Sequence, residues 1–366
     1  MVIMINQPGL FGLENTNRDF TKKKFWGKNQ FNSFFPTALA CYMGHKGIEP
    51  MYLTLNGNAE IEKQTITVEK LFGLKELLAN LRFNFEADYL PLTRLIAGNL
   101  PRVDLVTLDT ASYPNSYLRA LEIKLTALPD NQTAHLKEDK YGSEIVVRPD
   151  TIVYLGLNIA TIYLNDRATL LHLLEPTCNH INDWTKASQV FPLLPQLVET
   201  LKQVLIAKIS QQSPLLMQPI WKTEGKSGVL TDNCLDLFIW SDFGLTRLFV
   251  DRTLLPVRPS KLEPKAAINR PARAVLWLIK MLYDFANEGR FNQRRIIDEL
   301  TYDTKNDKAF AVGGNITHRY MNCDALIKPR ITKAVIKEII LGGGQDFLSP
   351  ERRLDATIIS TPGLFD

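Results

Sequence analysis

The amino-acid sequence predicts an α/β or α+β protein with a central mixed β-sheet flanked by helices. Residues 103–109 and 117–128 each form a strand-like run, and the segment between them is rich in turn-forming residues. Together they predict an antiparallel hairpin. Apolar residues recur at helical spacing over 193–209, the pattern of an amphipathic helix. Because helix-like and strand-like segments are mixed throughout the chain, we expect one sheet with helices packed around it.

The segment before the hairpin predicts further strands and two helices. Residues 51–56 and the alternating run 60–68 are typical of strands. Thr67 is a suitable N-cap for a helix that we expect to continue to Leu81. A short apolar run over 34–43, with a proline in its first turn, predicts another helix.

The segment after the hairpin is less regular. Residues 145–163 form a third β-like run that is interrupted by a proline and a glycine. We expect strands over 234–240 and 245–250, on either side of a short turn. Helices are predicted over 273–287 and 331–341, the second of them ended by a run of glycines.

The composition is that of a soluble globular protein, with 45% hydrophobic and 22% charged residues. No stretch approaches the roughly 18 apolar residues that a membrane span needs, and residues 1–20 lack the features of a signal peptide. The 4 cysteines form no CxxC pair, which favours reduced thiols in a cytoplasmic protein. The net charge of +4 is compatible with a nucleic-acid partner but does not require one.

Two carboxylates and a lysine are expected to meet at the hairpin. Glu122 and Lys124 are two positions apart on the second strand, so their side chains should share one face. Asp104 opens the first strand, within reach of that face. Two carboxylates suit Mg²⁺, which accepts one or two of them together with phosphate oxygens and water. The carbonyl group of Ile123 is a further candidate ligand, and the chemistry of such a site is phosphodiester hydrolysis.

This arrangement resembles the PD-(D/E)xK signature of type II restriction endonucleases. Pro101-Arg102-Val103-Asp104 is followed, after 17 residues, by Glu122-Ile123-Lys124. The resemblance implies a restriction-endonuclease-like core, with Mg²⁺ held by Asp104 and Glu122 and with Lys124 assisting the attacking water. The sequence departs from the signature in one respect, because Pro101 is not adjacent to Asp104.

Other acidic residues compete for places in this site. Asp109 is an alternative to Asp104 as the first carboxylate, although its separation from Glu122 is short for the superfamily. Glu69 or Glu76, on the preceding predicted helix, is a candidate for an additional acidic group.

A narrower resemblance covers most of the chain. The segments GLFGLENTNRDF at 9–20, WGKNQFNSFFP at 26–36 and ALEIKLTALPDNQT at 120–133 are similar to the HindVP/HgiDI family of restriction enzymes. This resemblance implies cleavage of double-stranded DNA at a palindromic site of the GRCGYC type. It also implies a homodimer and a cognate DNA methyltransferase as functional partner.

DNA contacts are expected from basic and amide side chains, which bind phosphates and base edges. Three segments carry them, at 22–28, 252–273 and 313–330. The candidate residues are Lys24, Lys28, Arg258, Arg270, Arg273, Asn315, His318 and Arg319.

We therefore expect a single large nuclease domain over 1–366. Its catalytic core is predicted at about 67–210. The regions 1–66 and 211–366 are expected to contain recognition insertions and to contribute DNA recognition and dimerisation. The competing interpretations are a repair or recombination nuclease of the same superfamily and a non-catalytic DNA-binding protein. Neither a dinucleotide-binding motif nor a nucleophile elbow supports a metabolic enzyme.

Overall fold

The computed structural model describes the greater part of the chain between residues 43 and 331. The described residues are 43–44, 47–73, 81–109, 116–123, 126–128, 144–224, 227–229, 235–253, 268, 270–302, 310–313 and 330–331. Lys24, Lys28, Lys124, Arg258, Asn315, His318 and Arg319 lie outside them, as does nearly all of the helices predicted at 34–43 and 331–341.

The fold is organised by one mixed β-sheet, which confirms the predicted class. Along its main path the strands lie in the order β2-β1-β10-β8-β5-β4-β3. Neighbours are antiparallel except for the pairs β1–β10 and β5–β8, which are parallel. The strands are β1 (Met51–Leu55), β2 (Ile61–Thr65), β3 (Leu81–Ala87), β4 (Val103–Asp109), β5 (Ser116–Ile123), β8 (Pro214–Glu224) and β10 (Leu235–Ser241).

Shorter strands extend this arrangement. β6 (Thr126–Leu128) and β9 (Ser227–Val229) pair with β8, and β12 (Arg330–Ile331) pairs with β10. β7 (Glu144–Val147) and β11 (Phe310–Gly313) form a separate two-stranded ribbon.

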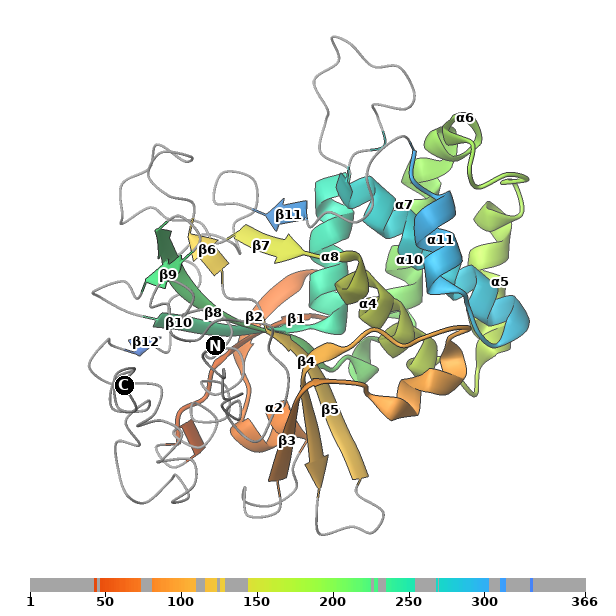
Figure 1. Ribbon diagram of the computed structural model, residues 1–366. Helices are drawn as coiled ribbons and strands as arrows, with labels where there is room; N and C mark the ends of the chain where they lie inside the picture. The colour runs from red at the N-terminus through yellow and green to blue at the C-terminus, as the bar shows by residue number, and fades with distance from the viewer. Residues whose placement is uncertain are drawn as a thin grey trace, which may run out of the picture.

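Most of the helices gather on one side of the sheet (Figure 1). The longest of the described helices, α10 (Arg270–Glu288), packs against α4 (Pro149–Ile162), α5 (Arg167–Cys178) and α8 (Asp242–Thr253). Their contacting side chains and the apolar residues on one face of the sheet form one buried core. The other helical segments are α2 (Val68–Phe72), α6 (Ala187–Val190), α7 (Leu194–Ile206), α11 (Gln293–Glu299), η4 (Leu90–Leu95), η6 (Phe191–Leu193) and η7 (Ile209–Gln211). Within the described residues, no helix is both long enough and apolar enough to cross a membrane.

The elements with a clear periodicity or clear turn signals are those that the sequence predicted correctly. The hairpin of β4 and β5 is antiparallel, and β1, β2 and β10 occupy their predicted segments. The amphipathic helix expected over 193–209 is α7, and the one expected over 273–287 is α10. Thr67 caps α2 as predicted, since its hydroxyl accepts a hydrogen bond from the backbone N–H of Lys70.

Three predictions of secondary structure were wrong. The β-like run at 145–163 contains β7 and then the helix α4, because Pro149 occupies the first turn of a helix and does not interrupt a strand. The strand predicted at 245–250 lies inside α8. The helix that begins after Thr67 ends at Phe72, where Gly73 adopts a φ of 80°, and Leu81 begins β3.

The sheet draws on all parts of the described chain. β1 and β2 precede residue 67, whereas β8 and β10 follow residue 210. These strands belong to the same sheet as the hairpin. The sheet therefore includes strands from before residue 67 and from after residue 210. The assignment of recognition and dimerisation to the terminal regions stays a prediction.

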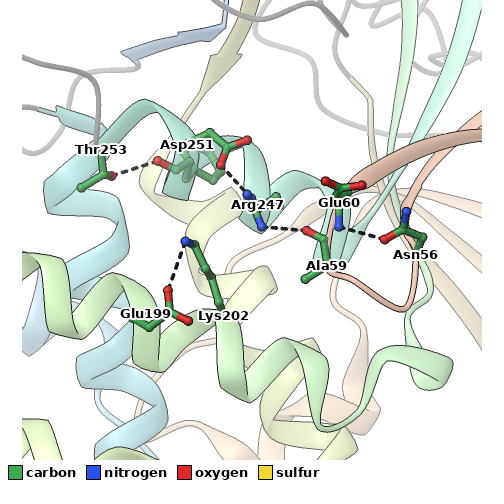
Figure 2. A network of polar contacts seen from close by, with 9 residues as sticks. Asn56, Ala59, Glu60, Glu199, Lys202, Arg247, Asp251 and Thr253 are labelled. Atoms are coloured by element: carbon green, nitrogen blue, oxygen red, sulfur yellow. Dashed lines mark hydrogen bonds and ion pairs between the residues drawn. The ribbon is translucent and has the colours of Figure 1, made fainter.

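Arg247 connects helix α8 to the turn between β1 and β2 (Figure 2). Its Nη1 donates a hydrogen bond of 2.7 Å to the carbonyl oxygen of Ala59, and its Nε lies 2.7 Å from a carboxylate oxygen of Asp251. Within the same turn, the side chain of Asn56 accepts a hydrogen bond from the backbone N–H of Glu60. These contacts hold α8 against the β1 side of the sheet.

Gly244 allows α8 to approach β1 closely. A Cβ at this position would lie 2.7 Å from the carbonyl oxygen of Leu53 and 2.9 Å from the hydroxyl of Ser241. Both distances are shorter than van der Waals contact, and the first involves backbone that cannot rotate away.

We therefore expect Gly244→Ala to lower the free energy of unfolding by about 1–3 kcal/mol, the usual range for overpacking. Chemical denaturation measures this change. Gly57→Ala is the matched control, because no atom lies within 4 Å of the Cβ position there. Equal stability of the two variants would show that the contact between α8 and β1 is not tight.

Asp242, at the start of α8, is fully buried. Burial raises the pKa of its carboxyl to about 6, although hydrogen bonds from Ser213 and Phe243 and the charge of Arg119 oppose the shift. The folded state therefore binds a proton more readily than the unfolded state, and the stability that this proton contributes is lost as the pH rises through about 6.

Asp242→Asn should remove this part of the pH dependence. An asparagine can accept the same backbone hydrogen bonds and does not ionise. Between about pH 5 and about pH 8, we expect the free energy of unfolding of the wild type to fall by on the order of 1 kcal/mol more than that of the variant. Parallel pH dependences of the two proteins would contradict this account of Asp242.

Candidate active site

The β4–β5 hairpin places Asp104 and Glu122 opposite each other. Leu105 pairs with Leu121 in the antiparallel register. One step further in the same register brings Asp104 beside Glu122, with both side chains on the same face of the sheet. The structure therefore brings together the two carboxylates that the sequence singled out.

A hydrogen bond across the hairpin holds the Asp104 carboxylate. Its Oδ2 accepts a hydrogen bond of 2.7 Å from the backbone N–H of Ile123, the residue that follows Glu122. The distance is short for an N–H donor, as expected where the acceptor is charged. The bond fixes one oxygen of Asp104 against the strand that carries Glu122.

The two carboxylates lie in a largely buried setting. Glu122 is 8% exposed and Asp104 is half-buried. Glu122 also pairs with Leu216 of β8, so it belongs to an interior strand of the sheet. Its neighbours Leu121 and Ile123 are buried on the opposite face. Two carboxylates that lie close together and are largely shielded from solvent repel each other, and a bound cation would relieve this repulsion.

The donor set fits Mg²⁺ better than a metal that needs a complete protein cage. Within the described residues, no group of three or more His, Cys, Asp and Glu side chains could hold a metal ion. Mg²⁺ commonly takes only one or two carboxylates and completes its octahedron with water and phosphate oxygens. The chemistry of Asp104 and Glu122 is therefore compatible with Mg²⁺.

Lys124 lies outside the described residues. The described residues on either side of it keep a single register with β8, in which Ile123 pairs with Met217 and Thr126 pairs with Ile220. The role of Lys124 stays a prediction from the sequence.

The alternative acidic residues lie away from this pair. Asp109 pairs with Ser116 at the other end of the hairpin, five residues and hence roughly 16 Å from Asp104 along the strand. Glu69 belongs to α2, which packs on the opposite face of β4, where the hydroxyl of Thr107 donates a hydrogen bond to the carbonyl oxygen of Phe72. Glu76 lies outside the described residues.

Arg273, one of the predicted DNA contacts, is buried. It is 1% exposed on α10, where its guanidinium lies over the ring of Trp277 and donates a hydrogen bond to the carbonyl oxygen of Thr301. This position argues against contact with a phosphate and indicates a structural role, so we withdraw it from the DNA-binding set. Arg270 begins α10, but its side chain is outside the described part of the structure.

Helix α4 contributes a residue that the sequence analysis missed. Tyr154 is buried, and its hydroxyl donates a hydrogen bond of 2.5 Å to the carbonyl oxygen of Pro101, just before β4. Tyr154 was not predicted from the sequence, because the strand-like run at 145–163 suggests no helix there. The proline in a position suited to a first helical turn was the available signal.

Comparison with known proteins finds a family and relatives that match nearly the whole chain. A model of the HindVP restriction endonuclease family matches residues 26–365. The chain is 48% identical to "Type II restriction enzyme HgiDI" from Herpetosiphon aurantiacus, over 100% of the chain and 99% of that protein. It is 42% identical to "Probable type II restriction enzyme HindVP" from Haemophilus influenzae, over 98% of the chain and 95% of that protein.

No solved structure matches the chain. The family model and the two relatives nevertheless extend over nearly its whole length and include both strands of the hairpin that carries Asp104 and Glu122. The chain therefore belongs to the HindVP restriction endonuclease family.

Proposed function

We propose that the protein is a type II restriction endonuclease that cleaves double-stranded DNA at a specific sequence and requires Mg²⁺. The observation that carries this proposal is the pair of carboxylates across the β4–β5 hairpin, with Asp104 held by the backbone N–H of Ile123. Membership of a restriction endonuclease family and two full-length relatives named as type II restriction enzymes support it.

The roles of the residues follow from their chemistry. Asp104 and Glu122 bind the metal ion, together with the carbonyl oxygen of Ile123. When bound, Mg²⁺ polarises the scissile phosphate and lowers the pKa of a coordinated water molecule. Lys124 orients that water, accepts its proton or stabilises the negative charge that develops on the phosphate.

The DNA substrate and the assembly remain proposals from the family resemblance. We propose a palindromic site of the GRCGYC type, cut by a homodimer in which each subunit cleaves one strand. A methyltransferase of the same specificity would protect the host DNA. Phosphate and base contacts are proposed for Lys24, Lys28, Arg258, Arg270, Asn315, His318 and Arg319.

Digestion of unmethylated phage DNA tests the activity. With Mg²⁺ we expect discrete fragments, and with EDTA no cleavage. Glu122→Gln keeps the size of the side chain but removes a charged ligand, and should lower the cleavage rate by at least about a hundredfold, more than the loss of an outer-shell partner would. Sequencing of the fragment ends identifies the recognition site.

Other results of the digestion would favour the alternative functions. Random nicking that requires Mg²⁺ would favour a repair or recombination nuclease. Sequence-specific DNA binding with no cleavage by the wild type would favour a non-catalytic DNA-binding protein. Cleavage that is equal in wild type and Glu122→Gln would remove the hairpin from the active site.

The identity of the first carboxylate has its own test. Asp104→Asn should reduce cleavage as strongly as Glu122→Gln, because it removes the second carboxylate of the pair. Asp109→Asn, at the far end of the same strand, should cleave DNA at the wild-type rate. The comparison is made by single-turnover kinetics at saturating Mg²⁺, and a large loss in Asp109→Asn alone would assign that role to Asp109.

A further inference from the structure

Tyr154 connects helix α4 to the segment that leads into the active site. It lies in the middle of α4 and is 1% exposed. Its hydroxyl donates a hydrogen bond of 2.5 Å to the carbonyl oxygen of Pro101, which is 53 positions away in sequence and three residues before Asp104. The bond therefore joins two segments that no β-ladder connects.

The same hydroxyl also lies close to the other end of the β3–β4 connection. The backbone of Tyr89, just after β3, lies near enough to the phenol to lower its pKa. Tyr89 and Pro101 lie on either side of η4, the helical turn between the two strands. The hydroxyl thus binds one end of the connection that leads into β4 and lies near the other.

The surroundings keep this hydroxyl in its neutral, donating form. Burial raises the pKa of Tyr154, and the nearby carboxylates of Asp88, Glu122 and Asp150 raise it further. Glu122, one of the proposed metal ligands, is thus among the charged groups that act on the phenol. A neutral phenol can donate to the carbonyl group of Pro101 throughout the physiological pH range.

Helix α4 is a rigid support for such a contact. It is buried on nearly all sides, and α10 packs against it so closely that a Cβ at Gly156 would lie 3.2 Å from the sulfur of Met281. By contrast, the described segment before β4 has no ladder partner between Ile96, which bridges to Phe291, and Val103, which pairs with Ala87. Within it, the carbonyl oxygen of Asn99 accepts a hydrogen bond from the side chain of Gln293. The hydrogen bond to Tyr154 fixes this segment from the side of the helix.

We propose that Tyr154 is a positioning residue, which holds the Pro101–Asp104 segment so that the Asp104 carboxylate stays in register with Glu122 for metal binding and cleavage. This inference rests on the proposed metal-dependent nuclease activity. Strand pairing with β3 and β5 places the backbone on either side of Asp104. Two hydrogen bonds add to it, one from the backbone N–H of Ile123 to the Asp104 carboxylate and one from Tyr154 to the backbone of Pro101. Tyr154 itself contacts neither substrate nor metal in this role.

Tyr154→Phe tests the proposal, because it removes only the hydroxyl. Tyr163→Phe is the matched control: Tyr163 is the C-cap of the same helix, is buried, and donates a hydrogen bond of 2.6 Å from its hydroxyl to the carbonyl oxygen of Val204. Each variant loses one bond from a buried tyrosine to a backbone carbonyl group. Their melting temperatures should therefore fall by similar amounts.

Only Tyr154→Phe should affect the active site. We expect its single-turnover cleavage rate at saturating DNA to fall about tenfold and its half-saturating Mg²⁺ concentration to rise, as is usual for outer-shell partners of a metal site. Its affinity for DNA without divalent metal should not change. Mn²⁺, which also prefers carboxylate and carbonyl oxygens, serves as a direct probe, and electron paramagnetic resonance titration should show about tenfold weaker binding to Tyr154→Phe than to wild type or Tyr163→Phe.

Three outcomes would overturn the inference. The first is wild-type cleavage and wild-type Mn²⁺ affinity in Tyr154→Phe. The second is a rate that falls equally in Tyr154→Phe and Tyr163→Phe, because the hydroxyl would then matter only for stability. The third is a wild type that neither cleaves DNA nor binds Mn²⁺, which would overturn the proposed function as well, whereas the first two leave it intact.

Discussion

The hydrogen bond from the backbone N–H of Ile123 to the Asp104 carboxylate is the constraint on which the site depends. Strand pairing alone brings Asp104 and Glu122 to the same face, but it leaves the aspartate free to rotate. The bond across the hairpin restricts that rotation. In the proposed metal site, one member of the acidic pair is therefore held before a metal ion binds.

The rest of the fold keeps the hairpin in place. β8 pairs in parallel with the strand of Glu122, so this carboxylate lies in the interior of the sheet and not on an edge that could fray. On the other side, α4 meets the start of β4 through Tyr154 and is itself enclosed by α10. The buried guanidinium of Arg273 belongs to this framework, in contact with Trp277 and with the backbone of Thr301.

The sequence predicted that Asp104 and Glu122 lie together because its signals there are local. The strand of Asp104 has well-defined ends, and Glu122 interrupts an apolar run at a position that packing alone does not explain. The helix α4 was missed because it is buried on nearly all sides, so its apolar residues show no helical period and its β-branched residues suggest a strand. α8 was missed for a related reason, since its short apolar run does not distinguish a buried helix from a strand. The order of the strands, with β8 between the hairpin and β10, depends on contacts between distant segments that no local pattern reveals.

The proposed function requires that Asp104 and Glu122 together bind the catalytic metal ion. Anomalous scattering from crystals of the protein bound to its DNA and grown with Mn²⁺ locates that ion. We expect an anomalous peak between the two carboxylates, within ligand distance of an oxygen of each and of a phosphate oxygen of the DNA. A peak at another set of residues, with none beside Asp104 and Glu122, would contradict it.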